Sequence, residues 1–499
     1  MLYPSIVECL ARNAARTPDK LCMADINKEY SYIETWNAIF GLSRKLISLG
    51  LKKEDCVVVE CNQSVDFLIW EQAIQLAGGI FVPLEKNAAM SRVAEIITET
   101  EARIHVSSRD LPADLAEDLA ADILHIDISE AGDYACSSNI DEIDFPASET
   151  VSEILFSTGT TGKSKGIVLT HGNDTALAEN VYTGVEMKPD NIEMIPMPTS
   201  HSHGLRRTYA NLANGSSVVF IDGITLLKRV FKMMDEYKVT AMDLSPSMLS
   251  IIFKLSRDRL GEYADQLDYI QLGSAPLSEE DREHLARLLP RTRLYNFYGS
   301  TEAGCSCLLN FNGSDKPKGC IGKPAVNSNF LVVDENRKVI ESSPDNLGFL
   351  ASSGTNNMKE YFKAPELTKE AMPDGDYIYT KDLGYIDEDG YIYMLGRKDD
   401  VINYGGVKIS PEEIESVVMK HPSVKDCACI PIKDKLSGQA PKLYIVLKEG
   451  AEYDAKEFKT FLAESIDANK QPARIEQIDE IPRTYNGKII RKELIALNE

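Results

Sequence analysis

The sequence predicts an α/β fold: a large N-terminal domain of parallel α/β sheets with a small β-barrel portion, followed by a mobile, small α+β domain. Strand and helix patterns alternate over residues 1–150, as in parallel sheets covered by helices. From about residue 327 the pattern changes to short strands with turns, which indicates the barrel-like portion. Residues 401–499 combine helices and strands in a unit of their own.

Local residue patterns predict the elements of the first part. Residues 32–49 have apolar side chains at helical spacing and are followed by Gly50, a helix stop signal. A second helix is predicted over 64–76, between apolar strands at 56–61 and 78–84. Two further strands are predicted at 102–108 and 122–128.

The later elements follow from the same patterns. A helix start is predicted at Ser410-Pro411, where a capping hydroxyl and a proline precede the acids Glu412 and Glu413. Further helices are predicted to begin near residues 173, 225 and 454, and strands are predicted at 217–221, 240–246, 330–335, 390–396, 427–432 and 442–448.

A domain boundary is predicted in the polar segment GRKDD, residues 396–400. This segment joins a strand to NYGGVKIS without a flexible spacer, which favours a hinge over a tether. We therefore expect a large domain over 1–396, a hinge over 397–400 and a small domain over 401–499.

Composition and charge exclude several classes of partner. The chain has 499 residues and a net charge of −23, whereas binding of nucleic acid or an anionic membrane requires basic patches. The ten cysteines form no C-x-x-C pair, so we expect reduced thiols in a cytoplasmic protein. The N-terminus lacks the apolar region of a signal peptide, and no window approaches the roughly 20 apolar residues of a membrane span.

A glycine-rich segment at 155–173, LFSTGTTGKSKGIVLTHGN, has the composition of a phosphate-binding loop. Glycines let backbone N–H groups approach a ligand, and hydroxyl and ammonium groups add donors. The segment is not a P-loop, because Ser157 stands where that motif needs glycine and a strand-like run follows Gly162-Lys163. For this loop alone, a flexible surface hairpin remains an equal alternative.

The loop is one of seven motifs, which are, in chain order, AGGIFVPL, STGTTGKSKG, PTSHSHGL, QLGSAPLS, NFYGSTEAG, YIYTKDLGYIDEDGYIYMLGRKDDVINYGGVKISPEEIE and PRTYNGKIIRKEL. Together they resemble the adenylate-forming superfamily of acyl-CoA synthetases, aryl-CoA ligases, peptide-synthetase adenylation domains and luciferases. The resemblance covers almost the whole chain. It implies that a carboxylate attacks the α-phosphate of ATP to give acyl-AMP and pyrophosphate, and that a thiol then displaces AMP.

On the ATP side, the resemblance implies specific roles. Glu302 would help place Mg²⁺, a hard cation that prefers oxygen, and Thr301 would meet phosphate. Asp382 would accept hydrogen bonds from the ribose, Arg397 would reach ribose or phosphate, and Lys488 would enter the site during adenylation. The other implied nucleotide-binding residues are Ser157, Thr158, Gly159, Thr160, Thr161, Gly162, Lys163, Lys165, Gly273, Ser274, Ala275, Asn296, Phe297, Tyr298, Gly299 and Ser300. The implied catalytic set is Lys488, Thr301, Glu302, His201 and Lys165.

Two positions depart from the residues usual in the family. Ser164 stands where proline is usual, and we expect a slightly looser loop. Lys381 stands where glycine often precedes the acid, which leaves Asp382 in place beside a charge.

On the acyl side, His201 matches a residue that lines the acid pocket, whereas a packed or capping histidine is an equal alternative for His203. Arg206 and Arg207 are unexpected: one could face a polar or acidic tail of the acid, and the alternative is a surface salt bridge. The resemblance implies a hinge at Asp399 and an acyl and thiol side that comprises His201, Arg207, Gly304, Cys305, Gly405, Gly406 and Lys408.

We therefore expect an ATP-dependent acid–thiol ligase that uses Mg²⁺ and makes an acyl-CoA. The alternative is a stand-alone adenylation enzyme that loads a carrier-protein phosphopantetheine. A luciferase-like oxygenase needs an oxidisable carbon in the acid, which the motifs do not reveal. A nucleotide sensor without catalysis is disfavoured, because Glu302, Asp382, Arg397 and Lys488 are all retained. The motifs specify neither the acid nor the oligomeric state.

Overall fold

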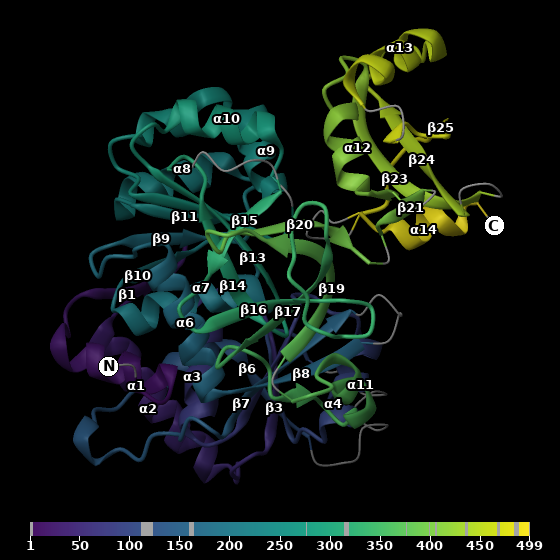
Figure 1. The fold of residues 1–499 in the computed structure, drawn as a ribbon. Coiled ribbons are helices and arrows are strands. Elements are labelled where there is room, and N and C mark those ends of the chain that lie inside the picture. Colours follow the sequence, from purple (N-terminus) through teal and green to yellow (C-terminus); the bar gives the residue numbers. More distant parts are fainter. Residues whose placement is uncertain are drawn as a thin grey trace.

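The structure, a computed structural model, confirms the predicted α/β class. A large body of sheets and helices is followed by a small α+β domain, drawn in yellow-green and yellow in Figure 1. The described residues are 3–110, 123–158, 164–275, 277–313, 319–375, 377–398, 400–404, 407–434, 438–466, 470–483 and 489–498.

The strands of the described residues form three sheets. The first sheet has the order β18-β8-β7-β4-β3-β5-β6, in which β7 to β6 are parallel neighbours and β8 turns back antiparallel to β7. This antiparallel return confirms that a strand follows the glycine-rich loop. The strands are β3 (Cys56–Glu60), β4 (Ile80–Leu84), β5 (Ile104–Ser107), β6 (Leu124–Asp127), β7 (Val151–Thr158), β8 (Ser164–Thr170) and β18 (Glu360–Tyr361).

The second sheet has the order β16-β17-β19-β20-β15-β14-β13-β12-β11-β9-β10-β1-β2. Neighbouring strands in the run β13-β12-β11-β9-β10-β1 are parallel, and β2 is antiparallel to β1. Strands β14 to β20 continue the sheet with antiparallel neighbours around their own apolar cluster, which includes Phe330, Leu350 and Ile392. The strands are β1 (Leu21–Ala24), β2 (Glu29–Ser31), β9 (Ile192–Ile195), β10 (Ser217–Phe220), β11 (Ala241–Leu244), β12 (Tyr269–Leu272), β13 (Arg293–Ser300), β14 (Gly304–Asn310), β15 (Cys320–Pro324), β16 (Ser328–Val333), β17 (Gly348–Gly354), β19 (Tyr377–Ile386) and β20 (Ile392–Arg397).

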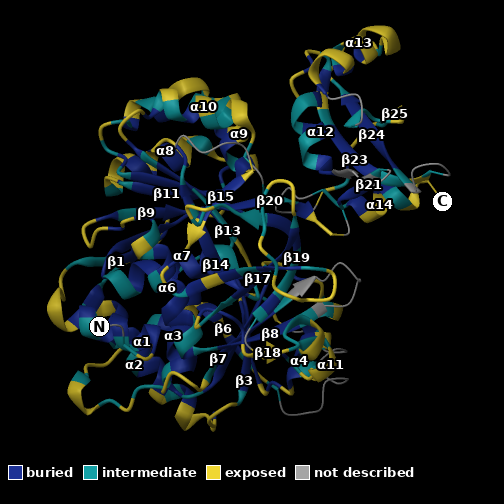
Figure 2. Cartoon of the chain, in the orientation of Figure 1, coloured by how far each residue is buried: buried dark blue, intermediate teal, exposed yellow. Residues whose placement is uncertain are grey.

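Helices cover the faces of these sheets. Figure 2 shows the strands in the dark blue of buried residues, whereas exposed residues gather on outer helices such as α10 and α13. Helices α3 and α7 are buried along most of their length, because they pack between layers. The helices of the large part are α1 (Ile6–Arg16), α2 (Tyr32–Ser48), α3 (Val65–Leu76), α4 (Met90–Thr100), α6 (His171–Gly184), α7 (Ser202–Asn214), α8 (Leu227–Tyr237), α9 (Pro246–Ser256), α10 (Glu279–Leu288) and α11 (Pro365–Ala371).

The third sheet belongs to the small C-terminal domain. Its strands have the order β22-β21-β24-β23, and β25 pairs with β24. Within the described part of the chain, no helix is long and apolar enough to cross a membrane. The elements are β21 (Ile402–Tyr404), β22 (Val407–Ile409), α12 (Pro411–Val418), β23 (Val424–Asp434), β24 (Gly438–Leu447), α13 (Ala455–Ser465), β25 (Arg474–Gln477) and α14 (Arg491–Ala496).

One predicted cap is corrected by the structure. Ser410 precedes α12 with an extended backbone, but its side chain makes no capping hydrogen bond to the helix. Its hydroxyl instead donates to Glu412 Oε2 at 2.7 Å, because this carboxylate lies within reach and competes with the backbone N–H groups. The proline and the first-turn acids of the predicted helix start are where the sequence placed them.

Because His171, at the start of α6, is buried, we expect the protein to lose stability in mild acid. Burial lowers the pKa of its imidazole from 6.5 to about 4. Between these values the unfolded chain binds a proton that the native state excludes, so stability falls as the pH falls below about 6.5. We expect His171 to lower the free energy of unfolding by about 2 kcal/mol between about pH 7.5 and about pH 5. His171→Gln should remove this part of the pH dependence. Urea unfolding of both proteins at both pH values measures it, and equal pH dependence would contradict the assignment.

Candidate active site

Tyr361 joins two of the predicted catalytic residues. It lies on β18, which pairs with β8, so its ring comes beside Lys165 of β8, whose Nζ is 5.3 Å from the ring centroid. Its hydroxyl donates to Glu302 Oε1 at 2.9 Å. Burial and then the Glu302 charge raise the pKa of Tyr361, while the Arg397 charge lowers it in part. Lys165 and Glu302 therefore contact one buried phenol, and the charge of Arg397 acts on it. Tyr361 was missed in the sequence because a lone tyrosine in a two-residue strand carries no signal.

Asp382 is held by two other predicted residues. It faces Arg397 across the β19–β20 pair, with Arg397 Nε 3.4 Å from Asp382 Oδ1. Tyr298 donates its hydroxyl to Asp382 Oδ2. Burial, followed by the Asp382 charge, raises the pKa of Tyr298 well above its usual value, so this phenol stays a donor. The Arg397 side chain is 56% exposed, so the ion pair is weak and leaves the guanidinium available to a ligand.

The position of Lys381 explains why glycine is often found there. Its backbone has φ of +64°, the left-handed region that glycine adopts without steric cost. Its ammonium group contacts Glu370 Oε1 at 3.0 Å, so the added charge is partnered at the surface.

The two histidines of the PTSHSHGL turn have different surroundings. His201 is the residue before α7, and burial lowers the pKa of its imidazole. His203 lies in the first turn of α7, with Nδ1 2.7 Å from Ser274 Oγ and Nε2 2.9 Å from Asp243 Oδ1. Its ring packs edge-on against Phe297 at 4.6 Å between centroids. His203 thus links α7 to the predicted nucleotide residues Ser274 and Phe297.

Arg206 and Arg207 do not form surface salt bridges, and that interpretation was wrong. Only 3% of Arg206 and 1% of Arg207 is exposed, because α7 packs between the two sheets. Arg206 Nη1 donates to Asp174 Oδ1 at 3.0 Å, and Nη2 contacts Glu153.

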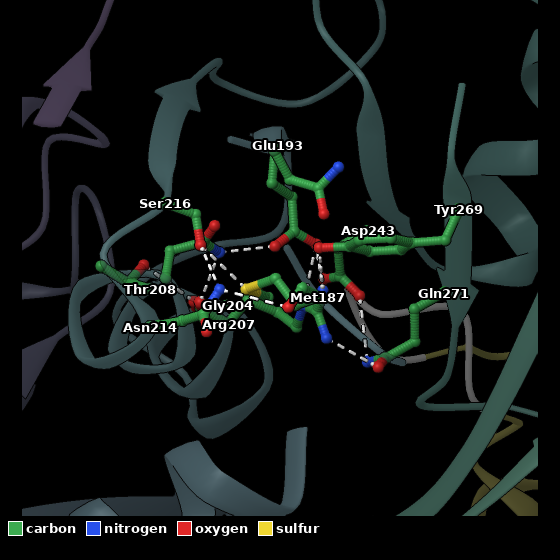
Figure 3. Close-up of polar contacts among 12 residues, drawn as sticks. Met187, Glu193, Gly204, Arg207, Thr208, Asn214, Ser216, Asp243, Tyr269 and Gln271 are labelled. Carbon is green, nitrogen blue, oxygen red and sulfur yellow. Dashed lines mark hydrogen bonds and ion pairs between the residues drawn. The ribbon is translucent and has the colours of Figure 1, made fainter. Parts of the chain in front are cut away.

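Arg207 lies over the second sheet (Figure 3). Its Nε donates to Glu193 Oε1 at 2.9 Å, Nη1 to Gln271 Oε1 at 2.7 Å and Nη2 to the Tyr269 hydroxyl at 3.1 Å. Each nitrogen of this guanidinium therefore has a protein partner, so Arg207 organises the surrounding side chains.

Residues 301–303 form the turn between β13 and β14, and the predicted site residues 296–300 and 304–305 lie on these two strands beside it. Gly299 and Gly304 approach so closely that a Cβ on Gly299 would lie 1.8 Å from the Gly304 carbonyl oxygen, which requires glycine. Cys305 is buried, and burial raises the pKa of its thiol to about 12, so it does not act as a thiolate nucleophile. Buried Oδ1 of Asn296 has no hydrogen-bond partner among the described atoms. Ser300 ends β13 and Thr301 follows it in the turn, and Gly273 and Ala275 flank Ser274 after β12.

Several predicted site residues lie outside the described residues. These are Gly159, Thr160, Thr161, Gly162, Lys163, the hinge residue Asp399, Gly405, Gly406 and Lys488. Ser157 and Thr158 end β7, Ser164 begins β8 and Lys408 lies in β22.

The oxygen donors at the site fit a Mg²⁺ ion that arrives with a nucleotide. Among the described side chains, no group of three or more His, Cys, Asp and Glu residues could hold a metal ion. Mg²⁺ usually takes one or two carboxylates and completes its octahedron with waters and substrate phosphates. The Glu302 carboxylate, beside Lys165 and Tyr361, supplies such a donor.

Comparison with known proteins identifies two matching family profiles. The profile of the AMP-binding enzyme family matches residues 10–362, and that of the AMP-binding enzyme C-terminal domain matches residues 413–488. The 4-coumarate-CoA ligase 1 of Narcissus pseudonarcissus is 26% identical, over 97% of this chain and 92% of its own length. The peroxisomal OPC-8:0-CoA ligase 1 of Arabidopsis thaliana is 25% identical, over 95% and 89%.

Solved structures share the fold. The ATP-bound MatB of Rhodopseudomonas palustris superimposes with a TM-score of 0.88 at 24% identity, covering 98% of both chains. The o-succinylbenzoate CoA synthetase of Bacillus subtilis, solved with its acyl-adenylate, has a TM-score of 0.85 at 24% identity, covering 98% of this chain and 97% of its own.

The match over residues 10–362 spans most of the chain, so this protein belongs to the AMP-binding enzyme family, within the adenylate-forming superfamily. It is an enzyme of that class, and the resemblance inferred from the motifs is confirmed.

Proposed function

We propose that this enzyme is an AMP-forming acyl-CoA ligase, which converts a carboxylic acid and ATP to acyl-AMP and pyrophosphate and then transfers the acyl group to CoA. The observation that carries the proposal is the gathering of Lys165 of β8 and Glu302 of the 301–303 turn at Tyr361, with Arg397 of β20 paired to Asp382. These residues are far apart in the chain, so their meeting reflects the fold and not local sequence.

Each of these residues has a role that suits phosphoryl chemistry. Catalysis of phosphoryl transfer depends on positioning and on stabilising charge at phosphoryl oxygens. The Lys165 ammonium supplies positive charge for the phosphates. Mg²⁺, held by Glu302 when bound, neutralises part of the phosphate charge. Asp382, oriented by the Tyr298 hydroxyl, accepts hydrogen bonds from the ribose, and the exposed Arg397 reaches ribose or phosphate.

CoA is favoured as the acyl acceptor over a carrier protein. The two relatives described above are both named CoA ligases, and each matches more than nine-tenths of this chain. Transfer to a carrier-protein phosphopantetheine is the second candidate, because the thiol is chemically the same in both.

ATP–pyrophosphate exchange over a panel of fatty, aryl, amino and dicarboxylic acids tests the first half-reaction. We expect exchange that depends on one class of acid and on Mg²⁺. Adding CoA to the positive acids should then give a thioester and AMP in equal amounts. Exchange without thioester from CoA, but with transfer to a phosphopantetheinylated carrier, would replace the first candidate by the second.

The proposed enzyme has a large domain over 1–396 and a small domain over 401–499. The hinge between them, 397–400, rotates between the two half-reactions. Asp399→Pro removes a backbone N–H and fixes φ at this point. We expect the variant to slow thioester formation at least about tenfold more than pyrophosphate exchange, because only the second step requires the rotation. Single-turnover rates for both steps measure this, and unchanged thioester turnover would remove the hinge role.

A further inference from the structure

A row of polar side chains lies on one face of the second sheet, where buried strands normally carry apolar residues. Asp243 and Gln271 are direct neighbours on β11 and β12, and Glu193 and Tyr269 flank Ala241 one pleat earlier. Residues two apart in a strand share a face, so these side chains form one polar patch. We call this patch, with His203 and Arg207 of α7 above it, the Asp243 cluster; Figure 3 labels its members other than His203.

The two carboxylate oxygens of Asp243 differ in their hydrogen bonds. Oδ1 accepts from His203 Nε2 at 2.9 Å and from Gln271 Nε2 at 3.5 Å. Asp243 is completely buried, yet its Oδ2 has no hydrogen-bond partner among the described atoms. A buried carboxylate oxygen without a donor is costly, so its retention in this cluster points to a donor from elsewhere.

The Asp243 cluster has more acidic groups than arginines. Glu193 and Asp243 supply two carboxylates, and Arg207 supplies one guanidinium, which forms hydrogen bonds with Glu193 and also acts on Asp243 through its charge. Among the described side chains, His203 makes the direct ionisable contact with Asp243. A donor group, above all a positively charged one, would therefore be stabilised at Oδ2.

Asp243 lies among the residues assigned to the acid substrate and its adenylate. His203 connects it directly to Ser274, and the His203 ring packs on Phe297. The charges of both Asp243 and Arg207 act on the buried thiol of Cys305, which places that side chain next to the cluster. The sequence analysis missed Asp243, although an acid inside the apolar strand AMDL was a usable signal.

We propose that the acid activated by this enzyme carries an amino or hydroxyl group, and that Asp243 Oδ2 accepts a hydrogen bond from that group. Asp243 is then a specificity-determining residue of the acyl site. This inference rests on the proposed function and names the class of its substrate.

Matched acids test the inference on the unmodified enzyme. Two series serve: butanoate with 3-hydroxybutanoate and 3-aminobutanoate, and benzoate with its 2- and 4-hydroxy and 2- and 4-amino derivatives. We expect kcat/KM in pyrophosphate exchange to be at least about 100-fold higher for the best donor-bearing acid than for its parent, because a site built to bind a donor rejects analogues that lack one. Preference for 3-aminobutanoate over 3-hydroxybutanoate identifies a cationic donor, whereas the aromatic amines of the aminobenzoates are neutral donors near neutral pH.

The outcomes separate the two levels of the proposal. Exchange that is equal or better with the parent acids overturns this inference and leaves the ligase function in place. Exchange with no acid, in these series or in the wider panel, overturns the ligase function and the inference with it.

Two substitutions locate the effect at Asp243. Asp243→Leu should reduce the discrimination between donor-bearing and parent acids at least about 30-fold, mainly through KM of the donor-bearing acid. Asp243→Asn keeps a neutral acceptor of the same shape, so it should lose preference for the amine while keeping activity on the hydroxy acid. Glu236→Gln, on the exposed side of α8, is the matched control and should change neither. Discrimination between donor-bearing and parent acids that survives in a folded Asp243→Leu enzyme overturns the assignment.

Discussion

Lys488→Ala is expected to reduce ATP–pyrophosphate exchange by at least about 100-fold while thioester formation from supplied acyl-AMP and CoA continues. In the proposed mechanism, the ammonium group stabilises charge that develops on phosphoryl oxygens in the first step alone, and loss of one such donor typically costs 10²–10³ in rate. Exchange assays with the best acid measure the first step. Release of AMP from supplied acyl-AMP measures the second.

A lysine on the same segment provides the control for this experiment. Lys492 is exposed in α14 and has no proposed role, so Lys492→Ala should leave both half-reactions unchanged. Equal loss of both steps in Lys488→Ala, with an unchanged Lys492→Ala enzyme, would show that Lys488 does not belong to the first half-reaction.

Arg206→Met is expected to destabilise the large domain by at least about 3 kcal/mol. Arg206 is buried against Glu153 and Asp174, and Tyr209 bridges Glu153 to Glu71 in the same network. Burial and then the neighbouring Glu153 charge raise the pKa of both Glu71 and Asp174 well above their usual values. Methionine preserves much of the packing but leaves the buried acids without their cation. Urea unfolding followed by tryptophan fluorescence measures the loss.

Two further proteins show whether charge or packing causes that loss. Arg291→Met removes an arginine from an exposed pair with Asp265 and should change stability by less than about 1 kcal/mol. Combining Arg206→Met with Glu153→Gln and Asp174→Asn removes the unpaired charges and should recover more than half of the lost stability. A combined protein no more stable than Arg206→Met would mean that packing, and not charge, is what Arg206 contributes.

Prediction from the sequence succeeded where the signal is local. The strand after the glycine-rich loop is β8, and the helices predicted over 32–49 and 64–76 correspond to α2 and α3 within two residues at each end. Apolar spacing and stop signals act within one or two turns of chain, so they can be recognised without knowing the neighbours. The prediction that Ser410 caps α12 was wrong. The competing hydrogen bond to the Glu412 carboxylate depends on side-chain geometry, which the local pattern does not specify.

The site shows the opposite balance. Arg206 and Arg207 resemble surface residues in the sequence, because no pattern near them in the chain indicates which acids neutralise them. Their partners Asp174, Glu153, Glu193 and Gln271 come from other elements, which only the packing of α7 between the two sheets brings together. Tyr361 was missed because its importance comes from the pairing of β18 with β8.

The sequence by itself determined the fold class, the family and the identities of the residues proposed for adenylation, because these depend on local pattern and on motifs in order. Only the tertiary structure decided that the two adjacent arginines are buried, that Lys165 and Glu302 meet at Tyr361, and that one buried oxygen of Asp243 has no donor among the described residues. Burial and pairing are properties of distant segments brought into contact, and the free energy of a charge depends on those contacts more than on its neighbours in the chain.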